Sequence, residues 1–464
     1  MRDIKVNVFL FFLFCIFVSC GNRGNGFRNS SQDSLNGQTL PVDTIVSKNK
    51  INSGLISRNG GYHYSVYLPD CYDKKKKLPV IIFFDPHAKA DIPLEKYKNL
   101  SNRYGFILLS SSDSKNGLQP NLYAEIYKSL KEEILSKYAA QPDRIYCAGF
   151  SGGARVAINV GLSDKTVAGV IANSAGFEPS RSPITADFVF AGIAGNEDFN
   201  LLEQRRTEKF LQELPAAHLL IEFDGTHEWA PEAAMEYAFA FLESDARRKF
   251  KPLVVDTVSR SFIEREIKKG ENIRDRWDRY QFLRRINFLL YEKTQLEKYT
   301  QEMLFLENTS EVRNKLKLRE EKNAQESVLQ SSYYNKVFTE SISWWQNEVK
   351  SLNRGAKDRE EILMNKRIKS YLSLAVYLTI TSPQARQEVI LMEKLIEIYA
   401  LVDEKNPEWA YQKALLRAKQ GNIEEATTYI KKSLDLGFKD KDRFYSQPEF
   451  VSLLANQEIL SQFR

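Results

Sequence analysis

The sequence predicts an α/β fold, in which a mostly parallel, doubly wound sheet is followed by an all-α region. Three observations lead to this prediction. From residue 53 to residue 250, short apolar runs alternate with stretches of helical periodicity. One of these runs, residues 78–84, contains no polar position, which is typical of a strand covered on both faces. After Phe250 glycine becomes scarce and Lys, Glu, Arg, Leu and Gln dominate, as expected for helices with charged outer faces.

Length and composition indicate a multi-domain globular protein. The chain has 464 residues, of which 43% are hydrophobic and 27% charged. Its net charge of +6 arises from 66 basic and 60 acidic residues, so the surface is nearly balanced and we expect no nucleic-acid partner. The four cysteines, Cys15, Cys20, Cys71 and Cys147, form neither a disulfide framework nor a metal site. We therefore expect no metal and no cofactor.

The first 20 residues have the pattern of an export signal. A positively charged start is followed by an apolar run from Val6 to Val18 and by small residues. Phe17-Val18-Ser19-Cys20 resembles a bacterial lipobox, and this resemblance implies that Cys20 becomes an acylated N-terminus anchored in a membrane. The alternatives are an ordinary cleaved signal or a single anchor helix. Because Gly21 is not an aspartate, the resemblance favours the outer membrane, facing either the periplasm or the surface.

Residues 21–52, rich in Gly, Asn, Ser and Gln, are predicted to be a flexible linker. The α/β domain is expected over residues 53–250. We predict strands at 62–68, 78–84, 106–109, 144–148, 167–172, 188–193 and 218–223, and helices near 94–104, 121–139, 151–162, 200–214 and 230–246. Parallel sheets bind ligands at the carboxyl ends of their strands, so functional residues are sought just after each strand.

Gly149-Phe150-Ser151-Gly152-Gly153 follows the strand expected at 144–148 and opens the next helix. This is the context in which a G-x-S-x-G sequence forms a nucleophile elbow, a sharp turn that exposes the serine. Serine needs a base that takes its proton before it can attack. The sequence therefore predicts Ser151 as a nucleophile and directs the search to histidine.

Four histidines are present, and only one follows the last predicted strand. His227 lies in Asp224-Gly225-Thr226-His227-Glu228-Trp229, and we predict it to be the base. His63 and His218 fall within strands, and His87 comes too early in the chain order. The acid that orients the base is expected between Ser151 and His227. We assign it to Asp198, with Glu197 as the rival; a solvated acidic turn that caps the next helix is the alternative.

Residues 60–245 resemble an α/β-hydrolase of the dienelactone hydrolase, polyester-depolymerase and feruloyl-esterase-like branch. The matching pieces are Asp143-Arg144-Ile145-Tyr146 before the serine elbow, Gly-Asn-Glu-Asp at 195–198 and Gly-Thr-His-Glu-Trp at 225–229. The resemblance implies an α/β-hydrolase fold and a catalytic triad of Ser151, Asp198 and His227.

One loop departs from that family, which usually has His-Gly after the third strand to supply an oxyanion-hole amide. Here the loop reads Phe84-Asp85-Pro86-His87-Ala88, and proline has no N–H. We therefore predict that one donor is the backbone N–H of His87 or Ala88 and that the other is that of Gly152. Alternatively, Asp85 or His87 shapes a specificity pocket.

Residues 251–464 are predicted to form a helical domain. Helical periodicity extends over 262–299, 315–353 and 358–380, and a short capping helix is expected at 448–463. Residues 406–438 resemble one tetratricopeptide helix pair, whose characteristic positions are occupied by Ala414, Gly421, Ala426, Ile430 and Leu434. We interpret Trp344 and Trp345 as core packing between helices, and a surface for stacking sugars or peptides is the alternative.

Together these features predict a serine hydrolase that cleaves carboxylic esters through an acyl-enzyme. Its substrate would be a small ester or an acylated or feruloylated polysaccharide in the cell envelope. Two alternatives remain at this point. One is a serine peptidase of the prolyl-oligopeptidase type. The other is a catalytically vestigial scaffold lipoprotein that binds a protein partner through its helical domain.

Overall fold

The computed structural model describes residues 46–177, 189–214, 216–249, 257–290, 292–354 and 356–461. The chain forms two compact units, which divide between Lys317 and Leu318. The predicted export signal, including Cys20, lies outside the described residues. No helix in the described part of the chain is long and apolar enough to cross a membrane.

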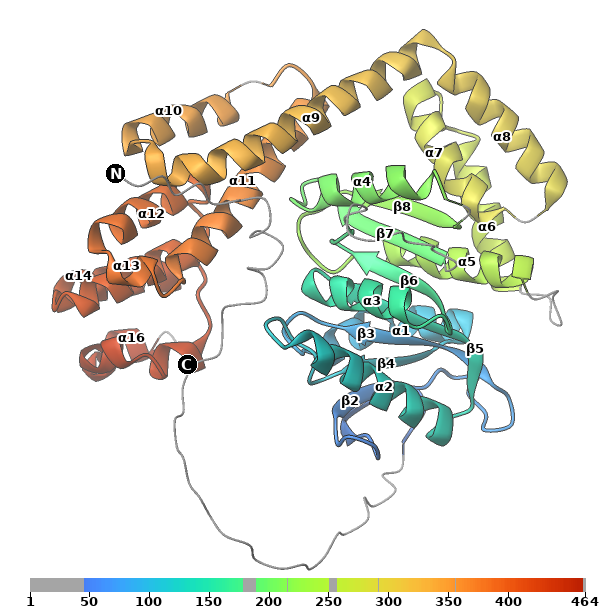
Figure 1. Ribbon diagram of the computed structural model, residues 1–464, viewed down its shortest axis with the longest axis horizontal. Coiled ribbons are helices and arrows are strands. Elements are labelled where there is room, and N and C mark those ends of the chain that lie inside the picture. The colour runs from blue at the N-terminus through green and yellow to red at the C-terminus, as the bar shows by residue number, and fades with distance from the viewer. Residues whose placement is uncertain are drawn as a thin grey trace, which may run out of the picture. The chain divides into compact units, whose positions relative to one another are not determined.

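One sheet organises the first unit (Figure 1). Within the described residues it has eight strands, in the order β1-β2-β4-β3-β5-β6-β7-β8. Strand β2 is antiparallel to both its neighbours, whereas β4, β3, β5, β6, β7 and β8 run parallel. The strands are β1 (Ile51–Ile56), β2 (His63–Tyr67), β3 (Leu78–Phe84), β4 (Ile107–Ser111), β5 (Ala140–Phe150), β6 (Val167–Asn173), β7 (Val189–Gly195) and β8 (His218–Phe223).

Helices cover both faces of this sheet. They are α1 (Asp91–Tyr104), α2 (Pro120–Lys137), α3 (Gly152–Ser163), α4 (Leu201–Leu211) and α5 (Glu232–Lys249). Apolar side chains of α1 and α5 pack into one buried cluster, and those of α2, α3 and α4 pack into another. Alternate residues of β3 enter the two clusters, with Ile81 and Phe83 in the first and Ile82 and Phe84 in the second. The fold class is therefore confirmed: a doubly wound, mostly parallel sheet of the α/β-hydrolase type.

The edge strand β1 was not predicted. Its sequence, Ile-Asn-Ser-Gly-Leu-Ile, does not alternate regularly, and its register with β2 shifts between Asn52 and Leu55. Gly54, with φ of 68°, lies within this irregularity, where a residue without Cβ adopts a positive φ at little cost. The first two residues of β1 belong to the segment predicted as a linker, so ordered structure begins before residue 53.

The division into units falls later in the chain than the predicted boundary at residue 250. Helices α6 (Thr257–Gly270), α7 (Arg276–Leu289) and α8 (Lys293–Glu307) belong to the first unit. Their buried side chains, such as Phe262 and Leu283, join the same cluster as Leu219 of β8 and Phe241 of α5. The composition changes at residue 250, but the apolar faces of these helices are buried against the α/β fold.

The second unit is helical. Its elements are α9 (Ser310–Thr339), which starts before the division, α10 (Ile342–Asn353), α11 (Arg359–Ile380), α12 (Val389–Val402), α13 (Pro407–Lys419), α14 (Ile423–Asp435), α15 (Lys441–Tyr445) and α16 (Gln457–Ser461), with 3₁₀ turns at Ala385–Gln387 and Pro448–Ala455. Trp345 is fully buried in its core, as expected for packing between helices. Helices α13 and α14 form the predicted pair and are joined at Gly421, whose φ is 78°. Their resemblance to a tetratricopeptide repeat stays a prediction.

A fully buried ion pair links α9 to α11. Arg367 donates from Nε to Oε1 of Glu326 at 3.0 Å and from Nη2 to Oε2 at 2.7 Å, and the two side chains are 1% and 0% exposed. We expect Arg367→Met to lower the free energy of unfolding of this unit by about 3–5 kcal/mol, because it leaves the Glu326 carboxylate buried without its partner. Urea denaturation followed by tryptophan fluorescence measures the change.

Two variants serve as controls for this prediction. Arg367→Met combined with Glu326→Leu should regain much of the lost stability, because no buried charge is left uncompensated. Arg260→Met disrupts an exposed pair with Glu292 in the first unit and should change the free energy of unfolding of that unit by only about 0–1 kcal/mol, leaving the transition of the second unit unchanged. Equal stability of the single Arg367→Met variant and the wild type would contradict the predicted cost of isolating Glu326.

Candidate active site

Ser151 occupies a strained turn between β5 and α3. Its φ of 52° and ψ of −117° lie outside the common regions for a residue with a side chain. The backbone N–H of Ser151 donates to the carbonyl of Asn173 at 2.8 Å, and its own carbonyl accepts from Ala154 and Arg155 in the first turn of α3. These bonds hold a conformation that otherwise costs about 1–3 kcal/mol. The turn therefore has the strained strand-to-helix geometry that a nucleophile elbow requires.

The flanking glycines of the elbow are required by close packing. A Cβ atom at Gly149 would lie 2.2 Å from the carbonyl oxygen of Gly153. A Cβ atom at Gly153 would lie 2.0 Å from the carbonyl oxygen of Phe84, at the end of β3. Since both obstacles are backbone atoms, no side chain can be accommodated without moving the elbow. The G-x-S-x-G pattern here reflects how tightly β3, β5 and α3 meet.

The structure brings together the three residues predicted as a triad. Nε2 of His227 lies 3.0 Å from Oγ of Ser151, and Nδ1 of His227 lies 2.9 Å from Oδ1 of Asp198. Asp198 is completely buried, whereas the His227 side chain is 20% exposed. Oδ1 of Asp198 also accepts the backbone N–H of Asn200 at 2.8 Å. Asp198, rather than its neighbour Glu197, is therefore the carboxylate bonded to the imidazole.

The loops after β7 and β8 come into close contact because Gly195 has no side chain. A Cβ atom at Gly195 would lie 2.3 Å from the carbonyl oxygen of Gly225, so the two loops pass with backbone against backbone. The backbone N–H of Glu197 donates to that same carbonyl at 3.0 Å. The imidazole of His227 then lies against two phenyl rings, with centroid distances of 4.8 Å to Phe150 and 4.2 Å to Phe199. This packing limits the orientations that the imidazole can adopt.

Asn173, at the end of β6, is a site residue that the sequence analysis missed. Besides accepting from Ser151 N–H, it accepts the N–H of Ala230 at its Oδ1 (2.7 Å) and donates from Nδ2 to the carbonyl of Glu228 (3.3 Å). It is fully buried. Asn173 thus links the backbone of Ser151, through its main-chain carbonyl, to the loop that carries His227, through its carboxamide. The sequence contains a signal for this residue, because Asn173 is the one polar residue of β6 and lies at its carboxyl end, where functional residues are expected.

Asp85 connects the loop after β3 to the same histidine loop. Its Oδ2 accepts the indole N–H of Trp229 at 2.9 Å, and the carboxylate is buried. Trp229 in turn packs against Phe150, with ring centroids 5.5 Å apart. The alternative in which Asp85 lines a specificity pocket is not what the structure shows, because its carboxylate is engaged internally.

The two amides predicted as alternative oxyanion donors after β3 are also engaged. The backbone N–H of His87 donates to Oδ1 of Asp85 at 2.9 Å, and that of Ala88 donates to the Asp85 carbonyl at 3.1 Å. Ala88 has a φ of 60°, so the loop turns sharply at this point. Gly152, by contrast, is the first residue of α3, where N–H groups have no intrahelical partner. The structure therefore leaves the Gly152 amide as the predicted donor beside Ser151.

The other histidines lie elsewhere. His63 is exposed at the start of β2 beside Asp113, and Nδ1 of His218 is 3.0 Å from the Ala216 carbonyl. The side chain of His87 is exposed. Within the described residues no group of three or more His, Cys, Asp or Glu side chains is arranged to hold a metal ion. Buried Cys147 lies in β5, and its burial raises the pKa of the thiol well above its usual range.

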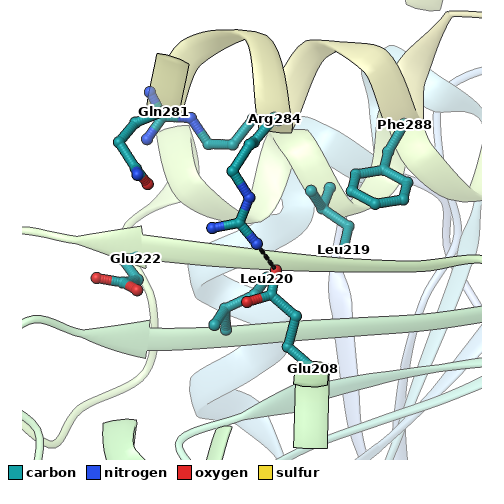
Figure 2. A pocket seen from close by; sticks show the side chains of 8 residues that line it. Glu208, Leu219, Leu220, Glu222, Gln281, Arg284 and Phe288 are labelled. Atoms are coloured by element: carbon teal, nitrogen blue, oxygen red, sulfur yellow. Dashed lines mark hydrogen bonds and ion pairs between the residues drawn. The ribbon is translucent and has the colours of Figure 1, made fainter. Parts of the chain in front are cut away.

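A separate small cavity lies between α4, β8 and α7, and no triad residue lines it. Figure 2 shows Arg284 reaching from α7 to Glu208, with a bond of 2.7 Å. Burial opposes the charge of Arg284, but the charge of Glu208 and its hydrogen bond outweigh that effect and raise the pKa of the guanidinium. The cavity has a volume of about 20 Å³, room for roughly one water molecule. The bond between Arg284 and Glu208 links α7 to α4 beside the sheet, and the cavity offers no space for a substrate.

No family model and no curated protein matches this chain. Solved structures similar to its N-terminal half include an esterase of Pyrobaculum calidifontis (13% identity, 43% of this chain, 86% of that chain, TM-score 0.36). Others are an S-formylglutathione hydrolase of Staphylococcus aureus (14%, 42%, 96%, 0.35) and a feruloyl esterase module of Clostridium thermocellum (16%, 41%, 84%, 0.34). These structural neighbours are esterases and related serine hydrolases.

Proposed function

We propose that this protein is a serine hydrolase of carboxylic esters. The observation that carries the proposal is the continuous chain of contacts from Oγ of Ser151 through His227 to buried Asp198, with distances of 3.0 and 2.9 Å. Nucleophile, base and orienting acid lie within hydrogen-bond reach in the order that acyl transfer requires. The position of the serine on a strained elbow supports the same proposal.

In the proposed reaction Oγ of Ser151 attacks the ester carbonyl while His227 accepts the hydroxyl proton of Ser151. The bonded carboxylate of Asp198 orients the imidazole and stabilises the imidazolium that forms. Gly152 N–H donates to the oxygen that becomes negative in the tetrahedral intermediate. His227 then protonates the leaving alcohol. In the second half of the reaction His227 takes a proton from water, which attacks the acyl-enzyme, and His227 returns that proton to Oγ of Ser151 as the acid is released.

The substrate class rests on the sequence resemblance to feruloyl-esterase-like enzymes. We propose an extracytoplasmic ester, such as an acylated or feruloylated polysaccharide, reached by a protein that is lipid-anchored at Cys20 in the outer membrane.

Metabolic labelling with a fatty acid tests the anchor, because Cys20→Ala should abolish incorporation. Equal incorporation by the Cys20→Ala variant would overturn the proposed anchor.

A panel of substrates tests the proposed reaction. Nitrophenyl acetate, a feruloyl ester, acetylated xylan and a proline-containing peptide would be incubated with the wild type and with Ser151→Ala. We expect turnover of at least one ester by the wild type alone. Turnover of the peptide with no ester cleaved would assign the site to a peptidase. No turnover of any substrate, together with no covalent labelling of Ser151, would overturn the hydrolase proposal in favour of a scaffold.

A further inference from the structure

The side chain of Asn116 lies against Gly152, the residue that follows the nucleophile. A Cβ atom at Gly152 would lie 1.8 Å from Oδ1, 2.8 Å from Cγ and 3.1 Å from Nδ2 of Asn116. The carboxamide thus fills the space that a side chain at position 152 would occupy. Position 152 therefore requires glycine, because the carboxamide of Asn116 occupies this space at the start of α3. The carboxamide lies beside the Gly152 N–H that is proposed to hold the oxyanion.

The backbone around Asn116 is fixed to the loop after β3. Its N–H donates to the carbonyl of Pro86 at 2.9 Å, and the preceding Lys115 forms an isolated antiparallel bridge with His87. On the other side, the hydroxyl of Tyr123 donates to the Lys115 carbonyl at 2.7 Å. These bonds hold Asn116 in place from two directions, so its position beside Gly152 is built into the fold.

No hydrogen bond among the described residues engages the carboxamide of Asn116. A rotation of 180° about the Cβ–Cγ axis would exchange Oδ1 and Nδ2 at nearly the same positions, so the group can present a donor where it now presents an acceptor. The neighbouring loop offers no ready substitute, since the amides of His87 and Ala88 are already bonded to Asp85.

We propose that the Asn116 side chain is the second oxyanion donor of this site, acting with the backbone N–H of Gly152. This inference rests on the proposed ester hydrolysis and extends it to one further catalytic residue. Nδ2 would donate to the carbonyl oxygen of the substrate as that oxygen becomes negative. In this role a polar side chain takes over from the backbone amide after β3, the element in which this chain departs from the hydrolases that it resembles.

Kinetics of two variants test the assignment. Asn116→Ala should lower kcat for nitrophenyl acetate by about 100- to 1000-fold with little change in KM. This is the loss seen when one oxyanion donor is removed from other serine hydrolases. Asn116→Asp has the same size but presents only acceptor oxygens, so it should lose more activity than Asn116→Ala. Binding of a trifluoromethyl ketone, which mimics the tetrahedral intermediate, should weaken in proportion to the loss in kcat/KM.

Asn121→Ala provides a matched control, because Asn121, like Asn116, is exposed, and within the described part of the chain its side chain bonds only Glu125, near the start of α2. It should retain wild-type kinetics, and all three variants should unfold at the wild-type temperature. If the wild type is active and Asn116→Ala stays within threefold of it, the Asn116 assignment alone is overturned. If the wild type cleaves no ester and Ser151 takes no label, the proposed function fails and the assignment fails with it.

Discussion

Replacing Ser151 with alanine is expected to lower kcat for an activated ester by about four to six orders of magnitude. The reason is that Oγ of Ser151 is the proposed nucleophile, and it lies 3.0 Å from Nε2 of His227, the proposed base. The fold should be unchanged, since alanine keeps the backbone bond from residue 151 to the Asn173 carbonyl. Steady-state hydrolysis of nitrophenyl acetate by purified wild type and variant measures the loss.

Ser163→Ala is the matched control for this experiment. Ser163 lies at the far end of α3 and is exposed, and among the described residues its hydroxyl bonds only to carbonyls of its own helix. We expect its kcat to stay within twofold of the wild type. If Ser151→Ala retains more than about one hundredth of the wild-type rate while remaining folded, the hydrolysis arises at another residue and the nucleophile assignment is wrong.

The second large effect is expected at the orienting acid. Asp198→Asn should lower kcat by about 10⁴-fold, because an amide in place of the carboxylate favours the wrong tautomer of His227. Asp198 is suited to the orienting role because it is completely buried and bonded at 2.9 Å to Nδ1 of the imidazole. The asparagine has nearly the same shape, so the loss should appear in kcat rather than in stability.

Glu197→Gln discriminates between the two acids that the sequence offered. Its carboxylate neighbours Asp198 in the chain, but the bond to the imidazole comes from Asp198. We therefore expect Glu197→Gln to remain within a few-fold of the wild type in kcat. The opposite pattern, with a large loss for Glu197→Gln and a small one for Asp198→Asn, would transfer the orienting role to Glu197.

Much of the fold and the grouping of Ser151, His227 and Asp198 could be predicted because the signals are local. The run Leu78–Phe84 indicates a buried strand, and Ser151 stands where a strand becomes a helix. His227 could be selected because catalytic residues follow strands in a fixed chain order in this fold. Each of these inferences needs only the neighbouring residues and the order of elements.

What could not be predicted depends on contacts between distant segments. The bonds of Asn173 to the histidine loop and of Asp85 to Trp229 join residues 55 and 144 positions apart in the chain. Which backbone amides after β3 are available as donors depends on the bonds that Asp85 forms with His87 and Ala88, and the spacing of residues in the sequence does not reveal these bonds. Likewise, helices α6–α8 have the composition of a separate helical domain, and only their buried faces assign them to the first unit.

Covalent labelling with a fluorophosphonate tests whether Ser151 is an activated nucleophile, because the label reports an activated serine without requiring the natural substrate. The folded wild type would be labelled and digested, and the modified peptide identified by mass spectrometry. We predict a single phosphonylated residue, Ser151, with labelling abolished in Ser151→Ala and strongly slowed in His227→Ala. Equal labelling of Ser151→Ala and the wild type would show that the activated serine lies elsewhere and that Ser151 is not the nucleophile.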